Sequence, residues 1–394
     1  MSATGRIPLS EVCRQDRGSV RPGELNHLRY LGMESIESGT GQLAHGDLTK
    51  TPEAPEANAF RFTPAHVLYG KLRPYLNKVF APDFEGKCST ELVPLLPCER
   101  LDRRYLAYFL RSPGTVAAIS QKVAGARMPR ADMSFVMSLS IPLPALETQR
   151  RIVELLSHAE NIVRMRREAE KRAKEIIPAL FLEMFGDPAT NPKGWAIRRL
   201  GDLVERLEGG KNIQAGATGD SPYRILKISA VTSGSYDETE SKPAPADFDP
   251  PAHYFVREGD ILFSRANTEA LVGATAMVDS TAGKALLPDK LWRLALRPAE
   301  GVAPAYMLAL LQNRSVRKEL SKMASGTGGS MKNISQAKLI ELRLPIAPAG
   351  LQRAFQERVS TVRGLLHGAY RAGQVAEQTL QSLLAGVFSE GMAI

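Results

Sequence analysis

The sequence predicts an α+β protein in which two similar α/β modules alternate with two long antiparallel helices, related by a pseudo-two-fold internal repeat. The first observation behind this prediction is that residues 149–185 align without a gap to residues 352–388, at a constant offset of 203. The second is that the segments before them also align, so that HVLYGK at 66–71 corresponds to DILFSR at 260–265. The chain therefore contains the same arrangement twice.

Both long segments place apolar residues at alternating steps of four and three, which is the spacing of a coiled-coil seam. At ~1.5 Å per residue each would form a helix roughly 50 Å long. Antiparallel pairing would set the small Ala369 and Gly373 opposite the long Arg166 and Glu170. Pro178 is expected to bend the first helix in its last turns, because an interior proline removes a backbone hydrogen bond. The alternative is a buried helix pair of an ordinary globular protein. The predicted seam comprises Ile152, Leu156, Val163, Ile177, Leu180, Phe355, Val359, Leu366, Leu380 and Leu383.

The two helices divide the rest of the chain into two modules and a linker. The stretch GDPATNPKG is rich in Pro, Gly and Asn, a composition typical of a linker. Each module contains a buried strand that ends in a cation, Lys71 in the first and Arg265 in the second. The predicted division is a first module at 1–148, a first helix at 149–185, a linker at 186–194, a second module at 195–351, a second helix at 352–388 and a tail at 389–394.

Charge and composition indicate the class of partner and the compartment. The 394 residues carry a formal net charge of +9, and Lys plus Arg exceed Asp plus Glu in each module and in each helix. This repeated excess predicts that both modules meet a polyanion. The three cysteines show no metal-ligand spacing, and we expect reduced thiols. No run of 18 apolar residues and no apolar signal segment occurs, so we expect a cytoplasmic protein without a membrane partner.

Four features in combination carry a resemblance to a known family. They are the strands GDILFSR and HVLYGK, the turn GGSMKNIS, the connector SIPLPALETQRRIV before a long helix, and the tandem order of module and helix. With these features the whole chain resembles the specificity subunit of type I restriction–modification systems. The resemblance implies two target-recognition domains that each read half of a bipartite double-stranded DNA site. It also implies that the helices set the spacing and dock two methylase subunits, which bind S-adenosylmethionine. Whether restriction subunits join the complex stays open.

Cations and amides near the predicted strands are the candidate DNA contacts. Base reading in the major groove favours Arg or Lys on guanine and Asn or Gln on adenine, whereas phosphate contacts need only charge and position. Lys71, Arg73, Arg265 and Asn267 follow the buried strands at equivalent places and are the candidate base readers. The alternative for these residues is a solvated surface charge. The candidate phosphate contacts are Arg127, Arg130 and Lys332 on the polar turns, with Lys227 and Arg224 as weaker candidates.

Enzyme motifs were tested and none fits. PDFEGK at 82–87 resembles a nuclease signature, but its acidic residues are only two positions apart. NPKG at 191–194 lacks the second proline and the aromatic residue of an adenine-binding methylase loop, and GGKN at 209–212 lacks the spacing of a phosphate-binding loop. We therefore expect no catalytic residue, no metal and no cofactor in this chain. The alternatives are a self-sufficient DNA-modifying or DNA-cleaving enzyme and a coiled-coil scaffold without sequence specificity.

Overall fold

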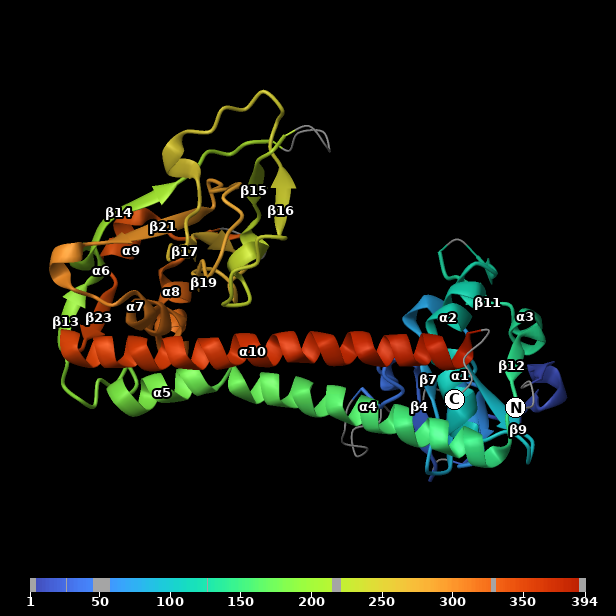
Figure 1. Ribbon diagram of the computed structural model, residues 1–394. Helices are drawn as coiled ribbons and strands as arrows, with labels where there is room; N and C mark the ends of the chain where they lie inside the picture. The colour runs from blue at the N-terminus through green and yellow to red at the C-terminus, as the bar shows by residue number, and fades with distance from the viewer. Residues whose placement is uncertain are drawn as a thin grey trace. The chain divides into compact units, whose positions relative to one another are not determined.

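The chain forms two compact units that each combine one module with parts of the long helices. In the computed structural model, the residues described are 5–25, 27–44, 57–125, 127–214, 221–326 and 331–389. Unit 1 comprises Met1–Glu168 and Ala369–Ile394, and unit 2 comprises Ala169–Gly368 (Figure 1). Gly328–Ser330 of the GGSMKNIS turn, and the predicted tail beyond Ser389, lie outside the described residues.

Two sheets build the module of unit 1. One has the order β2-β9-β6-β7 and is antiparallel, and the other has the order β3-β5-β8-β4, with β4 and β8 parallel. Val67 and Tyr69 of β6 face one apolar core, while Leu68 between them faces another. The strands are β1 (Arg6–Pro8), β2 (Cys13–Gln15), β3 (Ser19–Val20), β4 (Arg29–Leu31), β5 (Ala59–Phe62), β6 (Val67–Gly70), β7 (Val79–Phe80), β8 (Gly86–Ser89), β9 (Leu92–Pro97), β10 (Val123–Ala124), β11 (Arg130–Ala131) and β12 (Ser140–Pro142).

In the module of unit 2 the larger sheet matches that of unit 1, and the smaller sheet shares with its counterpart in unit 1 a parallel pair of strands. Its larger sheet runs β14-β21-β17-β19 and its smaller sheet β16-β15-β20, with β15 and β20 parallel. Ile261 and Phe263 of β17 face one core and Leu262 faces the other. The strands are β13 (Ala196–Arg199), β14 (Val204–Gly209), β15 (Arg224–Leu226), β16 (Ser241–Pro243), β17 (Ile261–Ser264), β18 (Ala266–Asn267), β19 (Thr275–Met277), β20 (Ala285–Leu286), β21 (Leu291–Leu296), β22 (Lys332–Asn333) and β23 (Arg343–Ile346).

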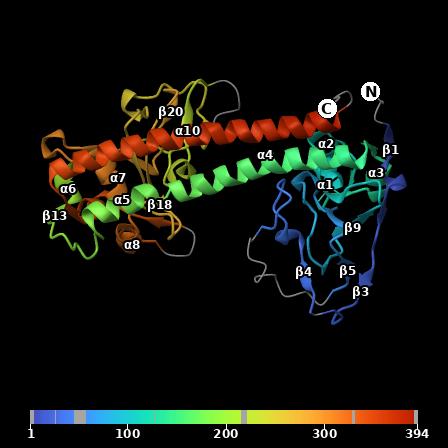
Figure 2. The same ribbon diagram turned by 60° about the horizontal axis from the view of Figure 1, so that its bottom comes forward.

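Short helices pack between the sheets and the long helices. In unit 1, α1 lies against α4, and the strands β3, β4 and β5 lie on the side away from α4 (Figure 2). In unit 2, α7 lies beside α10, and β15 and β16 lie on the side away from α10 (Figure 1). The short helices are α1 (Arg103–Arg111), α2 (Pro113–Ser120), α3 (Met133–Ser138), α6 (Leu200–Leu203), α7 (Pro304–Gln312), α8 (Arg314–Met323) and α9 (Gln336–Ile340).

The long helices begin earlier than predicted, and the first of them is broken into two helices. They are α4 (Leu146–Ala173), α5 (Ile176–Phe185) and α10 (Ala349–Phe388). Both long segments thus become helical three residues earlier than expected, since the turns before Gln149 and Gln352 are already helical. The break between α4 and α5 falls at residues 174–175. Pro178 accounts for it, because its ring conflicts with the carbonyl group four residues earlier.

Most predicted seam residues are buried inside their own unit. In unit 1 the start of α4 and the end of α10 share one core, and Arg167 Nε lies 2.8 Å from Glu377 Oε1 beyond it. Leu384 is buried more deeply than the predicted Leu383. Leu366 is only partly buried, and Arg166 is exposed. The fully buried members of the predicted seam are Ile152, Leu156, Val163, Phe355, Val359 and Leu380.

Aromatic rings at the helix ends join each long segment to a module. Phe185 ends α5 and stacks edge-on against Tyr306 and Phe355, with ring centroids 4.8 and 5.3 Å apart. Phe388 ends α10 and packs against Tyr105 of unit 1 at 5.2 Å. The helix that follows one module therefore ends in the core of the other, which explains why the compact units do not coincide with the predicted segments.

A buried glutamine fixes the start of each long helix to its module. Gln149 Oε1 accepts the backbone N–H of Asp102 at 2.8 Å, and its Nε2 donates to the Pro144 carbonyl at 2.8 Å. Gln352 Oε1 accepts the backbone N–H of Ala303 at 2.9 Å, and its Nε2 donates to the Ala347 carbonyl at 2.7 Å. Because buried backbone groups need partners, each amide replaces water at the module–helix junction.

Replacing Gln352 by leucine is expected to destabilise unit 2. The side chain would fit, but the Ala303 N–H and Ala347 carbonyl would lose buried partners, at a cost of about 2–4 kcal/mol in the free energy of unfolding. Gln356→Leu, an exposed position one turn later, is the matched control and is expected to change little. Urea denaturation of both variants measures the difference. Equal unfolding midpoints would contradict the role of the amide.

Two of the three free thiols are protected by burial. Cys13 and Cys88 are buried whereas Cys98 is exposed. Burial raises the pKa of the Cys13 and Cys88 thiols to about 12, since a thiolate is poorly solvated there.

Thiol labelling at pH 8 is expected to modify Cys98 alone in the folded chain. At this pH the two buried groups stay protonated, below their raised pKa, and inaccessible to the reagent. A colorimetric disulfide reagent should therefore report one fast thiol, and all three after denaturation. In Cys98→Ser the fast reaction should vanish, and a second fast thiol in the native protein would contradict the described packing.

Candidate nucleic-acid interface

In unit 1 the segment after β6 pairs with a distant polar turn. The Lys71 N–H donates to the Glu91 carbonyl at 2.9 Å, and the Lys71 carbonyl accepts the Ala131 N–H at 2.8 Å. The Arg73 N–H donates to the Pro129 carbonyl at 2.7 Å. We call residues 127–132 of unit 1 and 331–335 of unit 2 the turn segments. The pairing places the end of the buried strand β6 directly beside the first turn segment.

Unit 2 repeats these backbone contacts. The Arg265 N–H donates to the Lys290 carbonyl at 3.1 Å, and the Arg265 carbonyl accepts the Ile334 N–H at 2.8 Å. Asn267 of β18 pairs with Lys332 of β22. Strand register therefore makes the following positions equivalent: Lys71 and Arg265, Arg73 and Asn267, Glu91 and Lys290, Pro129 and Lys332, Arg130 and Asn333.

The structure thus brings together most of the predicted contact residues within each unit. Lys71 and Arg73 lie beside the turn segment that carries Arg127 and Arg130. Arg265 and Asn267 lie beside the turn segment that carries Lys332. The sequence separated these groups by more than 50 residues, and antiparallel pairing joins them.

Arg224 and Lys227 lie elsewhere and are held by local partners. Arg224 belongs to β15 in the smaller sheet, and its Nε donates to Ser241 Oγ at 2.8 Å. Lys227 Nζ lies 3.7 Å from a Glu240 carboxylate oxygen. Ser241 orients the Arg224 guanidinium, and Glu240 lies near the Lys227 ammonium group, and neither cation belongs to the turn segments.

The predicted readers differ in how firmly they are held. Arg73 has a left-handed backbone with φ of 51°, which turns the chain sharply after β6. Arg265 Nε donates to the Asp289 carbonyl at 2.7 Å, and its guanidinium lies 5.5 Å from the Trp292 ring centroid. Lys71, Arg127 and Lys332 make no ion pair with the part of the chain that the structure describes. Their charges are therefore available to an anion.

Arg130 is paired with Glu91, which the sequence did not indicate. Arg130 Nη2 donates to Glu91 Oε1 at 2.9 Å, and its Nε lies 3.2 Å from both carboxylate oxygens. These hydrogen bonds, together with the carboxylate charge, raise the pKa of the Arg130 guanidinium above its ordinary value. At the equivalent positions unit 2 has Lys290 and Asn333, which sequence reasoning also missed. The sequence signal that could have drawn attention to these positions is the change from Glu91 to Lys290 and from Arg130 to Asn333 between the aligned repeats.

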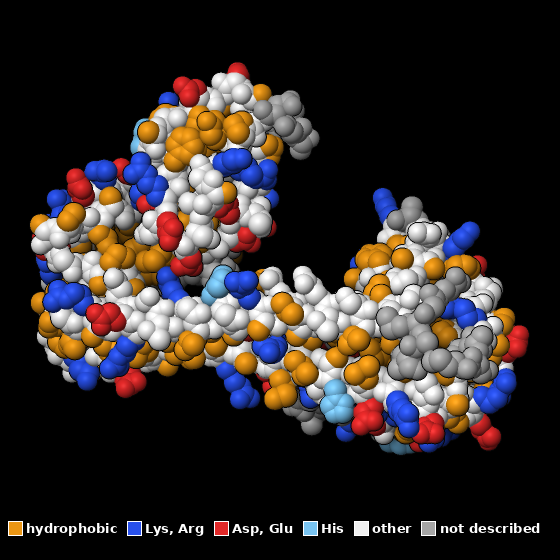
Figure 3. Space-filling view, in the orientation of Figure 1, with side chains coloured by type: hydrophobic (Ala, Val, Ile, Leu, Met, Phe, Trp, Pro, Cys, Tyr) orange, Lys and Arg blue, Asp and Glu red, His pale blue; other side chains and the backbone are white. Residues whose placement is uncertain are grey.

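Charged side chains of both signs are scattered over the face of each unit that Figure 3 shows. Figure 3 shows Lys and Arg interspersed with Asp and Glu on the face in view. Among the described residues there is no cluster of three or more His, Cys, Asp or Glu placed to hold a metal ion. In the same part of the chain no helix combines the length and apolar character needed to cross a membrane.

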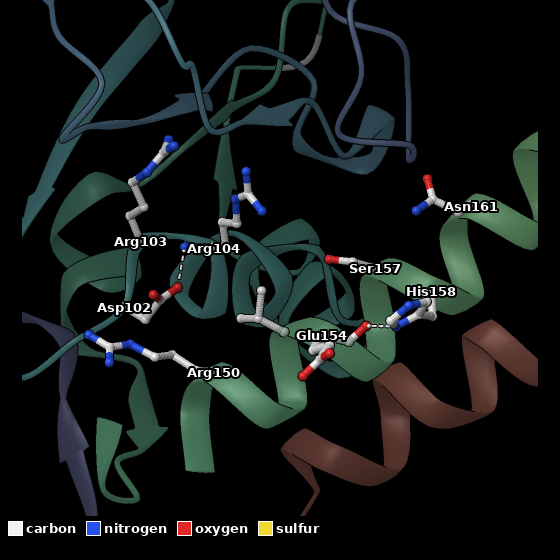
Figure 4. Close-up of a pocket in the computed structure, with 9 residues that line it drawn as sticks. Asp102, Arg103, Arg104, Arg150, Glu154, Ser157, His158 and Asn161 are labelled. Carbon is white, nitrogen blue, oxygen red and sulfur yellow. Dashed lines mark hydrogen bonds between the residues drawn. The ribbon is translucent and has the colours of Figure 1, made fainter. Parts of the chain in front are cut away.

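A polar depression of about 510 Å³ lies between α1 and α4 in unit 1. Figure 4 shows Arg103 and Arg104 on one side of it and His158 on α4. His158 Nδ1 lies 2.9 Å from the backbone carbonyl of Glu154, whereas Ser157 Oγ lies 3.1 Å from Tyr108 Oη. The hydroxyl and the imidazole are thus each engaged by other groups, and the depression does not join them into a nucleophile–base pair.

Part of the chain is similar to known proteins. Residues 54–174 match the family model described as the type I restriction modification DNA specificity domain. The specificity subunit of the type I restriction enzyme EcoEI of Escherichia coli is 32% identical over 170 residues, covering 42% of this chain and 28% of that subunit. Residues 54–174 thus resemble a type I restriction modification DNA specificity domain, and the chain is similar to type I restriction enzyme specificity subunits.

Further relatives of this specificity-subunit family cover more of the chain. The MjaVIII specificity subunit of Methanocaldococcus jannaschii is 23% identical over 299 residues, 72% of this chain and 68% of that subunit. A solved chain from a study of assembly and conformational transition of the type I R-M system has a TM-score of 0.60 at 22% identity, covering 98% of both chains. The type I S subunit of M. genitalium has a TM-score of 0.57 at 12% identity, covering 98% of this chain and 96% of that one. The two structural likenesses support the tandem mixed α and β fold.

Proposed function

We propose that this chain is the DNA-recognition subunit of a type I restriction–modification complex and reads an asymmetric bipartite site. Each module reads one half of double-stranded DNA. The chain itself is not catalytic: methylation, with S-adenosylmethionine bound by two methylase subunits, and any cleavage by restriction subunits reside in partners. The similarity to specificity subunits and the surfaces of the two modules support this proposal.

One observation carries the proposal most directly. Both modules hold the segment after a buried strand against a turn segment with the same backbone hydrogen bonds, yet the side chains at these positions differ. A common framework with different polar groups is what two unlike half-sites require, because base edges are distinguished by donor and acceptor patterns. Lys71 and Arg73 would read one half, and Arg265 and Asn267 the other. Arg127, Lys332 and the weaker candidates Arg224 and Lys227 would contact phosphates.

The long helices would act as an antiparallel coiled-coil spacer. The 40 residues of α10 correspond to a rod of about 60 Å at 1.5 Å per residue. That length is on the order of one to two turns of B-DNA, so both modules could reach major grooves on one face. We retain the predicted domain division, with the helix starts moved to Leu146 and Ala349.

Methylase docking would use apolar residues that the helices leave exposed. The buried seam residues are committed to the cores of the units, so they are poor candidates for an outer surface. Leu155, Ile162 and Met165 of α4 are 47%, 51% and 67% exposed, and Leu365 of α10 is 71% exposed. Ile176, Leu180 and Val362 also line an apolar depression in unit 2. Exposed apolar side chains in such number are typical of an interaction surface.

Selection from random double-stranded DNA is expected to enrich a bipartite site with an unread gap. Arg265→Ala should weaken preferences in one half only, because Arg265 belongs to one module. Arg151→Ala, an exposed change on α4, is the control and should leave both halves intact. Loss of both halves with Arg265→Ala would contradict the reader assignment. Label transfer from S-adenosylmethionine, or Mg²⁺-dependent cleavage by the purified chain alone, would contradict the non-catalytic role.

Lys332→Ala is expected to weaken binding uniformly across DNA sequences. A phosphate contact releases about one counterion, so the slope of log K against log salt should fall by roughly one. The control is Lys322→Ala, whose cation already pairs with Glu319 on α8. Binding titrations at several salt concentrations measure the slope. A change in base preference with an unchanged slope would instead make Lys332 a base reader.

A further inference from the structure

Arg130 and Asn333 occupy equivalent positions in the two modules. Arg130 forms a bridge with Leu72, and Asn333 pairs with Ala266. The next residue in each case donates its N–H, at 2.8 Å, to the carbonyl of the cation that follows the buried strand. Register in a strand fixes which face a side chain occupies. The two residues therefore occupy equivalent positions in their modules, each opposite the residue that separates two candidate readers along the chain.

Glu91 holds one edge of the Arg130 guanidinium and leaves another free. The contacts at 2.9 and 3.2 Å use Nε–H and one N–H of Nη2. Since arginine has five N–H groups, both N–H groups of Nη1 and the second of Nη2 stay unused. The side chain keeps 43% of its surface exposed. The free edge has the two-donor geometry that matches guanine O6 and N7.

The Glu91–Arg130 ion pair contributes little to the stability of the fold. A surface pair of this exposure is screened by water and contributes little to stability. Its clear effect is to restrict a long, flexible side chain to one orientation. A pre-oriented guanidinium loses less conformational entropy when it binds, which favours recognition.

Unit 2 offers a different group on the same framework. Asn333 is partly exposed, and its amide makes no hydrogen bond within the described residues, although its backbone N–H and carbonyl both bond to Ser325. Lys290 replaces the carboxylate of Glu91 and cannot accept a hydrogen bond from the neighbouring side chain. A free asparagine amide supplies one donor and one acceptor, the pattern that matches adenine N7 and N6–H₂.

We infer that Arg130 and Asn333 are equivalent base-reading residues, with Arg130 specific for guanine in one half-site and Asn333 for adenine in the other. Glu91 is the positioning residue of Arg130. This inference rests on the proposed function, and it moves Arg130 from the phosphate contacts expected from the sequence to the base readers. The equivalent residues Glu91 and Lys290 would then also determine specificity, in addition to the base-reading residues.

The test is random-site selection with the full-length chain and double-stranded oligonucleotides. Arg130→Ala should lose one guanine preference, roughly tenfold to hundredfold, and keep every other fixed base. Asn333→Ala should lose one adenine in the opposite half. Arg127→Ala, in the same turn segment without a described partner, is the matched control and should lower affinity without changing any base.

Variants of Glu91 separate positioning from a structural role. Glu91→Ala releases Arg130, so guanine preference should fall while binding to random DNA tightens and its salt slope steepens by about one. Glu91→Gln keeps an acceptor oxygen and should restore part of the preference. The thermal midpoint should barely change. A lowered midpoint with unchanged base preference would overturn the positioning role.

Transplanting the pair provides the converse test. The double variant K290E/N333R gives unit 2 the residues of unit 1 and should replace the selected adenine by guanine at one position. N333R alone, without the supporting carboxylate, should give a weaker guanine preference. An unchanged half-site in the double variant, or with Arg130→Ala, would overturn the inference. A wild-type chain that enriches no bipartite site would instead contradict the proposed function itself.

Discussion

The buried amides of Gln149 and Gln352 are the constraint on which the arrangement of each module and its helix depends. Each amide ties the loop before α1 or α7 to the connector that begins the following long helix. Water cannot replace these bonds, since both side chains are almost completely buried. A polar junction of this kind has one satisfied geometry, whereas an apolar contact would tolerate sliding. The direction in which each helix leaves its module is therefore fixed by hydrogen-bond geometry.

An ion pair also joins each module to its long helix. The helix carries the acidic partner in unit 1 and the basic partner in unit 2. In unit 1, Glu160 of α4 pairs with the buried Arg111, whose Nη2 also donates to the Gly39 carbonyl at 3.0 Å. In unit 2, Arg363 of α10 pairs with Asp279 at 2.9 Å, and Gln312 donates to the Gly234 carbonyl at 2.7 Å. In unit 1 the pair is largely buried, so removing either partner would leave a costly unpaired charge. In unit 2 the Asp279 side chain is 62% exposed, so water screens the pair and it contributes less.

Periodic features of the fold followed from the sequence, whereas pairings across distant segments did not. The buried strand before Lys71 and the helical seams are local patterns, and hydrophobic spacing is sufficient to predict them. The helix start at Leu146 was missed because the seam begins later than the helix itself. Glu91 lies far from Arg130 in the chain, and only the register of β9, β6 and the turn segment brings them together. The sequence does not give that register, so Glu91 and Arg130 could not be paired beforehand, although the aligned repeats differ at both positions.

On the proposed function, the contrast between the rigid junctions and the candidate reading surfaces would let one scaffold serve two different half-sites. Gln149 and Gln352 are identical in the two halves because their partners are backbone groups, which do not vary with sequence. Arg130 and Asn333 can differ because the framework around them is held by backbone hydrogen bonds and by the buried neighbours Ala131 and Ile334, not by their own side chains. A substitution there changes the donors and acceptors offered to DNA without disturbing a core. On the proposed function, specificity could consequently change at low cost in stability, while the junction between each module and its own helix stays the same.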